Sequence, residues 1–356
     1  MKLGNVEGEI NGLWQVAHDS GELTSAVTSY DITGLEGDTD IEYQLIFRFV
    51  GGANSSYGLR FNSDTGSNYG KQYIASANTT PYAARQIGRN RLPLSHLNNL
   101  LQNEISFAEM HMFSKSGKER TTISTQAERA SGAIVAYVDK IAGVWSNTAD
   151  EIASINLFAD TADGLGIGTR IILLKKVHND GMKTGTLTPN KIEGAWERIY
   201  SNTLTSAAAT HTISNLTGNT DVLYRLVIRG TDDTTVGVWK LLLNNDATNL
   251  YGNQVLSGID ATVAASRATP SCAIIGNTAT DDDITMSDTL IYAKSGFERT
   301  MLTNMSASIS TTTVTGIYLY GQVYNETSTE ITSMVISATA DNMNIGTHIE
   351  LYRLNL

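Results

Sequence analysis

The stretch Ile41-Glu42-Tyr43-Gln44-Leu45-Ile46-Phe47-Arg48-Phe49 decides the fold class. All of its odd-numbered positions are apolar and most of its even-numbered positions are polar. Alternation of this kind is typical of a β-strand that buries one face in a core. The same register recurs in Val222-Leu223-Tyr224-Arg225-Leu226-Val227-Ile228-Arg229. Each stretch therefore predicts a half-buried antiparallel strand.

The sequence on either side of these two strands is repeated as well. The distance between equivalent residues drifts only from 182 (Trp14 to Trp196) to 178 (Ile167 to Ile345). The clearest matching segments are 31–40 with 212–221, 59–64 with 241–246, 115–121 with 294–300, and 167–173 with 345–351. A repeat this long is a whole domain rather than a solenoid unit. The sequence thus indicates a tandem duplication.

The predicted fold is all-β, with two tandem antiparallel β-sandwich domains of jelly-roll type. About eight strands per copy are expected from the turn signals, and an immunoglobulin-like sandwich is the alternative, for which each copy is long. A helical turn is expected only at 93–101. The predicted organisation is an N-terminal arm at 1–12, domain 1 at 13–178, a polar linker at 179–194 and domain 2 at 195–356. Residues 1–180 and 193–356 are expected to fold when expressed separately.

Composition excludes several classes of protein. The 356-residue chain has a net charge of −11, which disfavours nucleic acid as a partner. No run reaches the roughly 20 apolar residues of a membrane span, and no secretory signal opens the sequence. The lone Cys272 excludes a disulfide framework. We expect no nucleic-acid partner and no membrane partner.

Catalytic motifs are not found in the sequence. It has no Gly-x-Ser-x-Gly nucleophile elbow and no phosphate-binding loop. None of the six His residues recurs at an equivalent position in the second copy. We therefore expect a protein that is not an enzyme and that has no catalytic residues, no cofactor and no resident metal.

One turn contains oxygen-bearing side chains at alternate positions. Asn62-x-Asp64-x-Gly66-x-Asn68 resembles the start of a calcium loop, but Tyr73 stands at the twelfth position, where such a loop carries an acidic residue. We expect Asn62 and Asp64 to bond backbone groups at a strand end instead. The full set of candidate calcium ligands is Asn62, Asp64, Asn244, Asp246, Asp281, Asp282 and Asp283.

Aromatic residues also recur between the copies. Trp14 matches Trp196, and we expect this pair to lie in a core or between the domains. Trp145 aligns with Tyr324, and Trp239 aligns with Tyr57. Shared core positions explain both of these pairs, while Trp239 is also the candidate platform for a glycan.

Two motifs connect the chain to known proteins. Leu59-Arg60-Phe61-Asn62-Ser63-Asp64-Thr65-Gly66-Ser67-Asn68-Tyr69 resembles a strand-turn motif of structural proteins from tailed bacteriophages and related viruses. Gly346-Thr347-His348-Ile349-Glu350-Leu351-Tyr352 is similar to the closing strand of such proteins. The resemblance implies a virion structural protein: a capsid decoration or turret, a tail-tip or baseplate component, or a fibre.

The resemblance also implies assembly in the host cytoplasm and other virion proteins as partners. We expect a homo-oligomer, with a trimer as the first choice, since surface proteins of virions occupy symmetric positions. Deletion of residues 1–12 is expected to weaken attachment to the particle. The alternative function is a carbohydrate-binding pair of sandwiches that adheres to a host-surface glycan.

Overall fold

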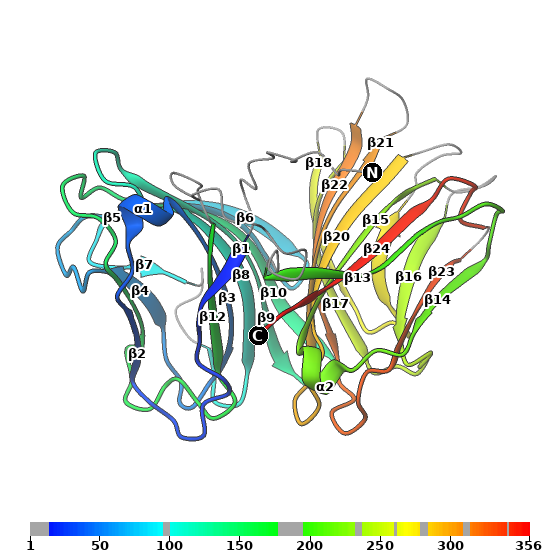
Figure 1. Cartoon of the computed structure of the whole chain (residues 1–356), viewed down its shortest axis with the longest axis horizontal. Helices are drawn as coiled ribbons and strands as arrows, with labels where there is room; N and C mark the ends of the chain where they lie inside the picture. The colour runs from blue at the N-terminus through cyan, green and yellow to red at the C-terminus, as the bar shows by residue number, and fades with distance from the viewer. Residues whose placement is uncertain are drawn as a thin grey trace, which may run out of the picture.

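The computed structural model describes residues 14–94, 100–176, 195–231, 237–259, 262–277, 284–308, 314–339 and 342–356 (Figure 1). The predicted arm and linker, 1–12 and 179–194, lie outside these residues. The strands of domain 1 are β1 (Trp14–Asp19), β2 (Ser29–Thr33), β3 (Glu42–Val50), β4 (Tyr57–Phe61), β5 (Tyr69–Ala77), β6 (Thr80–Arg89), β7 (Leu92–Pro93), β8 (Ile105–Phe113), β9 (Arg120–Ser131), β10 (Ile134–Trp145), β11 (Ser154–Ala159) and β12 (Arg170–Lys176).

Domain 2 repeats this succession element by element. Its strands are β13 (Trp196–Thr203), β14 (Thr210–Ser214), β15 (Leu223–Gly230), β16 (Val238–Leu243), β17 (Tyr251–Ile259), β18 (Thr262–Ala268), β19 (Ala273–Asn277), β20 (Ile284–Tyr292), β21 (Arg299–Ser308), β22 (Val314–Tyr324), β23 (Ser333–Ala338) and β24 (His348–Leu354). Each domain also has one helical turn, α1 (Gly37–Asp40) or α2 (Gly218–Asp221).

Each domain is a sandwich of a large and a small antiparallel sheet. The eight-stranded sheets have the orders β1-β12-β3-β8-β9-β10-β5-β6 and β13-β24-β15-β20-β21-β22-β17-β18. The four-stranded sheets have the orders β2-β11-β4-β7 and β14-β23-β16-β19. The two orders are the same once β1 to β12 are matched with β13 to β24. The predicted all-β fold with two tandem sandwiches is confirmed.

Three details differ from the sequence-based expectation. The helical turns α1 and α2 lie at 37–40 and 218–221, where only turns of the chain were expected. Each domain has more strands than the expected eight or so, because the long hairpins β5–β6 and β9–β10 and their counterparts extend the large sheet. Leu92 and Pro93 form a short strand where a helical turn was expected, since they bond to β4. Residues 95–99 of that expected turn lie outside the described part of the chain.

A buried arginine explains the repeated Lys-Ser-Gly-x-Glu-Arg-Thr motif. Gly117 and Gly296 have φ of 86° and 87°, which glycine adopts without strain, and each turns the chain into β9 or β21. Arg120 and Arg299 follow, fully buried, and donate to the backbone carbonyls of Asn147 and Glu326. Each guanidinium thus fixes the loop that leaves β10 or β22.

The domains join through the outer faces of their large sheets, so that the small sheets lie on the two far sides (Figure 1). Among the described residues, no helix is long and apolar enough to cross a membrane.

Candidate functional site

The seam between the domains is the most extensive feature outside the two sandwich cores. A cluster of buried apolar side chains from both large sheets fills it, and Trp14 and Trp196 pack against this cluster as expected. The amide of Ala195 donates to the carbonyl of Trp14, which ties the first strands of the two domains together. The cluster comprises Ile46, Phe107, Ala127, Val135, Ile172, Leu174, Ala195, Val222, Leu223, Leu290, Tyr292, Leu302, Val323 and Leu354.

Arg48 of β3 is the main polar anchor of the seam. Its side chain is 1% exposed, and its Nη1 donates to the carbonyl of Gly168 at 2.9 Å. The guanidinium lies 5.0 Å from the ring centre of Tyr292 and 4.5 Å from that of Phe297, both in domain 2. Such cation–π contacts stabilise most when they are shielded from water.

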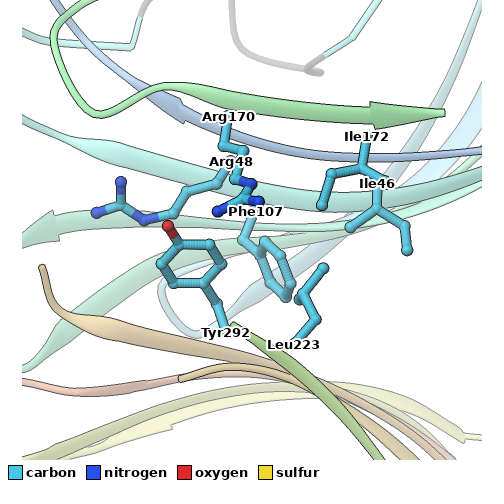
Figure 2. A pocket seen from close by; sticks show the side chains of 7 residues that line it. All are labelled: Ile46, Arg48, Phe107, Arg170, Ile172, Leu223 and Tyr292. Atoms are coloured by element: carbon cyan, nitrogen blue, oxygen red, sulfur yellow. The ribbon is translucent and has the colours of Figure 1, made fainter. Parts of the chain in front are cut away.

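Figure 2 shows how the side chains meet around Arg48. The crevice there is too narrow to hold a water molecule. It is lined by Ile46, Arg48, Phe107, Arg170, Ile172, Leu223 and Tyr292. This part of the seam is a packed contact rather than a ligand chamber.

Ion pairs surround the apolar centre. Glu22 accepts from Arg170 at 3.1 Å within domain 1, and from Tyr292 at 2.8 Å and Lys294 across the seam. Burial by itself would raise the pKa of the Glu22 carboxyl, but these partners hold it below its ordinary value. Glu109 likewise pairs with Arg225 at 3.4 Å across the seam. The pKa of the Glu109 carboxyl is also lowered, with Arg225 among the causes, so Glu22 and Glu109 are ionised and paired in the seam.

In the candidate calcium turn of domain 1, the side-chain oxygens of Asn62 and Asp64 accept hydrogen bonds from the protein itself. Asp64 accepts from the Gly66 amide at 2.7 Å, the Asn68 side chain at 2.8 Å and the Trp145 indole at 2.7 Å. Asn62 accepts from the amides of Ala153 and Ser154 and donates to the Glu151 carbonyl. Both side chains bond groups of the β10–β11 region, as a structural turn requires.

Domain 2 repeats these contacts. Asp246 accepts from the Thr248 amide at 2.8 Å and from the Tyr324 hydroxyl at 2.7 Å. Asn244 donates to the Glu330 carbonyl and accepts from the amides of Thr332 and Ser333. Tyr324 thus occupies the place of Trp145 and bonds the equivalent carboxylate, which gives this aromatic pair its shared core position.

We expect Asp64→Ala to lower the free energy of unfolding by about 2 kcal/mol, since three hydrogen bonds to a carboxylate are lost. Asp246→Ala, which removes two, should cost less. Urea denaturation with and without millimolar calcium measures both quantities. The melting temperature of the unaltered chain should not respond to calcium. A clear rise that Asp64→Ala or Asp246→Ala abolishes would identify a calcium site in these turns.

Trp239 cannot act as a glycan platform, which corrects the assignment made from the sequence. The side chain is 0% exposed and belongs to the core of domain 2. Its counterpart Tyr57 is 3% exposed in the core of domain 1. A sugar platform needs an exposed ring face, and β16 turns this indole inward between the sheets.

The other charged candidates do not converge. Asp281, Asp282 and Asp283 lie outside the described residues. Across the described part of the chain, no three His, Cys, Asp or Glu side chains lie close enough to hold a metal ion.

Domain 1 encloses charged side chains that domain 2 lacks. Lys71, Glu128 and Asp139 are 3%, 3% and 0% exposed on the inner side of the large sheet. Burial raises the pKa of Glu128 and lowers that of Lys71 to about 8. The equivalent positions in domain 2 carry Asn253, Ala307 and Tyr318. Because these charges are enclosed, they offer no open site to a ligand.

A His–Tyr pair recurs with its partners exchanged, and sequence reasoning missed it. In domain 1, His18 on β1 bonds Tyr30 on β2 at 2.9 Å. In domain 2, Tyr200 on β13 bonds His211 on β14 at 2.7 Å. Position-by-position matching found no repeated His, because the two residues have changed strands. A comparison of residue pairs would have found the signal.

We expect His18→Tyr and Tyr30→His each to lower the free energy of unfolding by about 1 kcal/mol. The double exchange should restore most of this loss, since domain 2 already uses that arrangement.

The His–Tyr pairs should also respond to pH. Burial lowers the pKa of His18 and His211. The unfolded chain therefore binds protons first as the pH falls below about 6.5, and the pairs lose stability there. Urea denaturation at neutral and mildly acidic pH tests both points. A double variant no better than the worse single variant would contradict them.

Comparison with known proteins identifies no family for the chain. No protein family matches the chain, and no curated protein matches it. Mouse laminin alpha1 chain, domains LG4-5, is similar over 97% of this chain and 92% of that one, at 10% identity and a TM-score of 0.20. The LG1-3 region of the laminin alpha2 chain is similar over 92% and 63%, at 7% identity and a TM-score of 0.19. TM-scores this low carry no argument about fold or function.

Proposed function

We propose that the chain is a non-enzymatic structural protein of a tailed virus, displayed on the capsid or tail surface and acting through contacts with other subunits. The resemblance of residues 59–69 and 346–352 to virion proteins is the observation that carries the proposal. In this proposal the protein joins the particle in the host cytoplasm, and its partners are other virion proteins.

The use that the molecule makes of its repeated motifs supports this proposal. Asn62, Asp64, Asn244 and Asp246 lock turns, and Arg120 and Arg299 hold loops. The repeated polar residues thus stabilise turns and loops, and the two domains pack closely along the seam. Both features suit a structural role in a larger assembly.

The proposal is tested on purified virus particles. Mass spectrometry should find the chain in stoichiometric amounts, and electron microscopy should place its two-domain density on the particle surface. We further propose that residues 1–12 take part in attachment, so a chain lacking them should bind stripped particles more weakly. If the chain is absent from the particles and binds to a glycan array, the proposed function is wrong and carbohydrate binding takes its place.

A further inference from the structure

One row of side chains crosses the outer face of each large sheet, and the two rows differ in exposure. In domain 1 the row is buried in the seam, with Phe107 and Val138 at 0%. In domain 2 the equivalent Met286 and Ile317 are 52% and 60% exposed. The buried row is Arg48, Phe107, Ala127, Val138 and Ser76 with the half-buried Pro81 at its end, and the exposed row is Arg229, Met286, Ser306, Ile317 and Val263 with the half-buried Gly258 between the last two.

The buried row of domain 1 packs against a patch of domain 2. This patch is buried in domain 2, whereas the equivalent patch of domain 1 is exposed. In domain 2, Tyr292 and Leu302 are 1% and 2% exposed. Their equivalents in domain 1, Phe113 and Ile123, are 50% and 48% exposed. The buried patch is Val222, Leu256, Tyr292, Leu302 and Gly321, and the exposed patch is Ile74, Phe113, Ile123 and Ala142, with the half-buried Ile41 at its edge.

The seam is therefore a contact between two different surfaces, a row on one domain and a patch on the other. Each domain has both surfaces but uses only one. The chain consequently carries an unused row on domain 2 and an unused patch on domain 1. The patch is apolar, and the row exposes Met286, Ile317 and Val263 together with Arg229 and Ser306. Exposed apolar side chains gathered on one face in this way mark an interaction site.

Both domains have a strained residue at the edge of the patch. Ile41 and Val222 have φ of 63° and 62°, which is unfavourable for a β-branched residue. The strain in domain 2 places Val222, 4% exposed, in the seam cluster. Domain 1 keeps the same strained residue type at Ile41, whose carbonyl accepts from Ser114 beside Phe113. In domain 2 the carbonyl of Val222 accepts from Ala293 in the same way, so bonds within each domain hold both residues in this conformation.

We propose that the exposed row of domain 2 docks on the exposed patch of domain 1 of a second copy of this chain. Within the chain the equivalent row and patch pack against each other. Beside the exposed patch, Lys118 of domain 1 stands where the seam has Phe297, and Glu42 and Lys176 stand where it has Leu223 and Leu354. Arg229 would meet Phe113 of the second copy as Arg48 meets Tyr292 within the chain. A contact between unlike surfaces closes into a ring or grows into a filament, and a three-membered ring would give the expected trimer. This inference rests on the proposed function, in which the chain acts through contacts with other subunits, and it specifies the surfaces that form one such contact.

Charge substitutions in the two exposed surfaces test the contact. Ile317→Asp alters the row, Ile123→Asp alters the patch, and Ile345→Asp, at a residue 63% exposed outside both surfaces, is the matched control. Sedimentation velocity over a wide range of concentrations should show an oligomer for the unaltered chain and the control. Either altered chain should associate at least about tenfold more weakly. Circular dichroism verifies that each variant is folded.

Mixing the two altered chains identifies the surfaces involved. One retains an intact patch and the other an intact row, so an equimolar mixture should form a one-to-one dimer although each chain alone is monomeric. An unaltered chain that stays monomeric at every concentration, or an oligomer that both variants leave intact, overturns the inference. Because the assay needs no virus, a chain that oligomerises but is missing from particles overturns only the proposed function.

Discussion

Arg48→Ala should lower the free energy of unfolding by about 3 kcal/mol, whereas Arg229→Ala should leave it nearly unchanged. Arg48 is 1% exposed, bonds the Gly168 carbonyl and lies against Tyr292 and Phe297. Its removal leaves a buried carbonyl without that donor and abolishes two shielded cation–π contacts. Arg229 occupies the same place on β15 but is exposed.

Urea denaturation of the two variants measures this difference. Since the residue type and strand position are the same, intrinsic β propensity cancels in the comparison. Equal losses in both variants would show that the seam does not depend on the Arg48 anchor.

Gly252→Ala should separate the two domains in thermal unfolding. A Cβ at residue 252 would overlap the carbonyl of Ala133 from domain 1, and a backbone atom cannot move away as a flexible side chain can. Overpacking of this kind costs about 1–3 kcal/mol. The equivalent Gly70→Ala is the control, since its Cβ would approach only Val144 at 3.3 Å and the Gln86 carbonyl at 3.5 Å.

Calorimetry detects the separation. We expect one transition for the unaltered chain and for Gly70→Ala, and two transitions for Gly252→Ala. A single unchanged transition in all three chains would contradict the close approach of Ala133 and Gly252.

The alternation at 41–49 and the constant repeat spacing were enough to predict the sandwiches and their duplication. Both are local or nearly local signals, because a strand with one face in a sandwich core alternates and a copied domain keeps its order. The expected half-burial of 41–49 was wrong, since the outer face of β3, with Gln44, Ile46 and Arg48, is buried as well. The prediction that residues 1–180 and 193–356 fold separately stays a prediction. The buried row would be exposed in the first fragment, and the buried patch in the second.

The seam could not be predicted in the same way. Val138 and Ile317 are similar residues at equivalent positions, yet one is 0% and the other 60% exposed. No pattern within a strand distinguishes them, since their burial depends on where the other domain lies. Trp239 was misassigned for a related reason: a lone aromatic residue in a strand does not reveal which sheet face it occupies.

Arginine-specific modification with phenylglyoxal, followed by mass spectrometry of the native chain, tests the asymmetric seam most directly. Arg48 and Arg229 have the same chemistry, and Arg120 and Arg299, both 0% exposed, serve as protected references. At concentrations where the chain is monomeric, we predict rapid labelling of Arg229 and protection of Arg48 comparable to that of the references. Equal labelling of Arg48 and Arg229 would contradict the account.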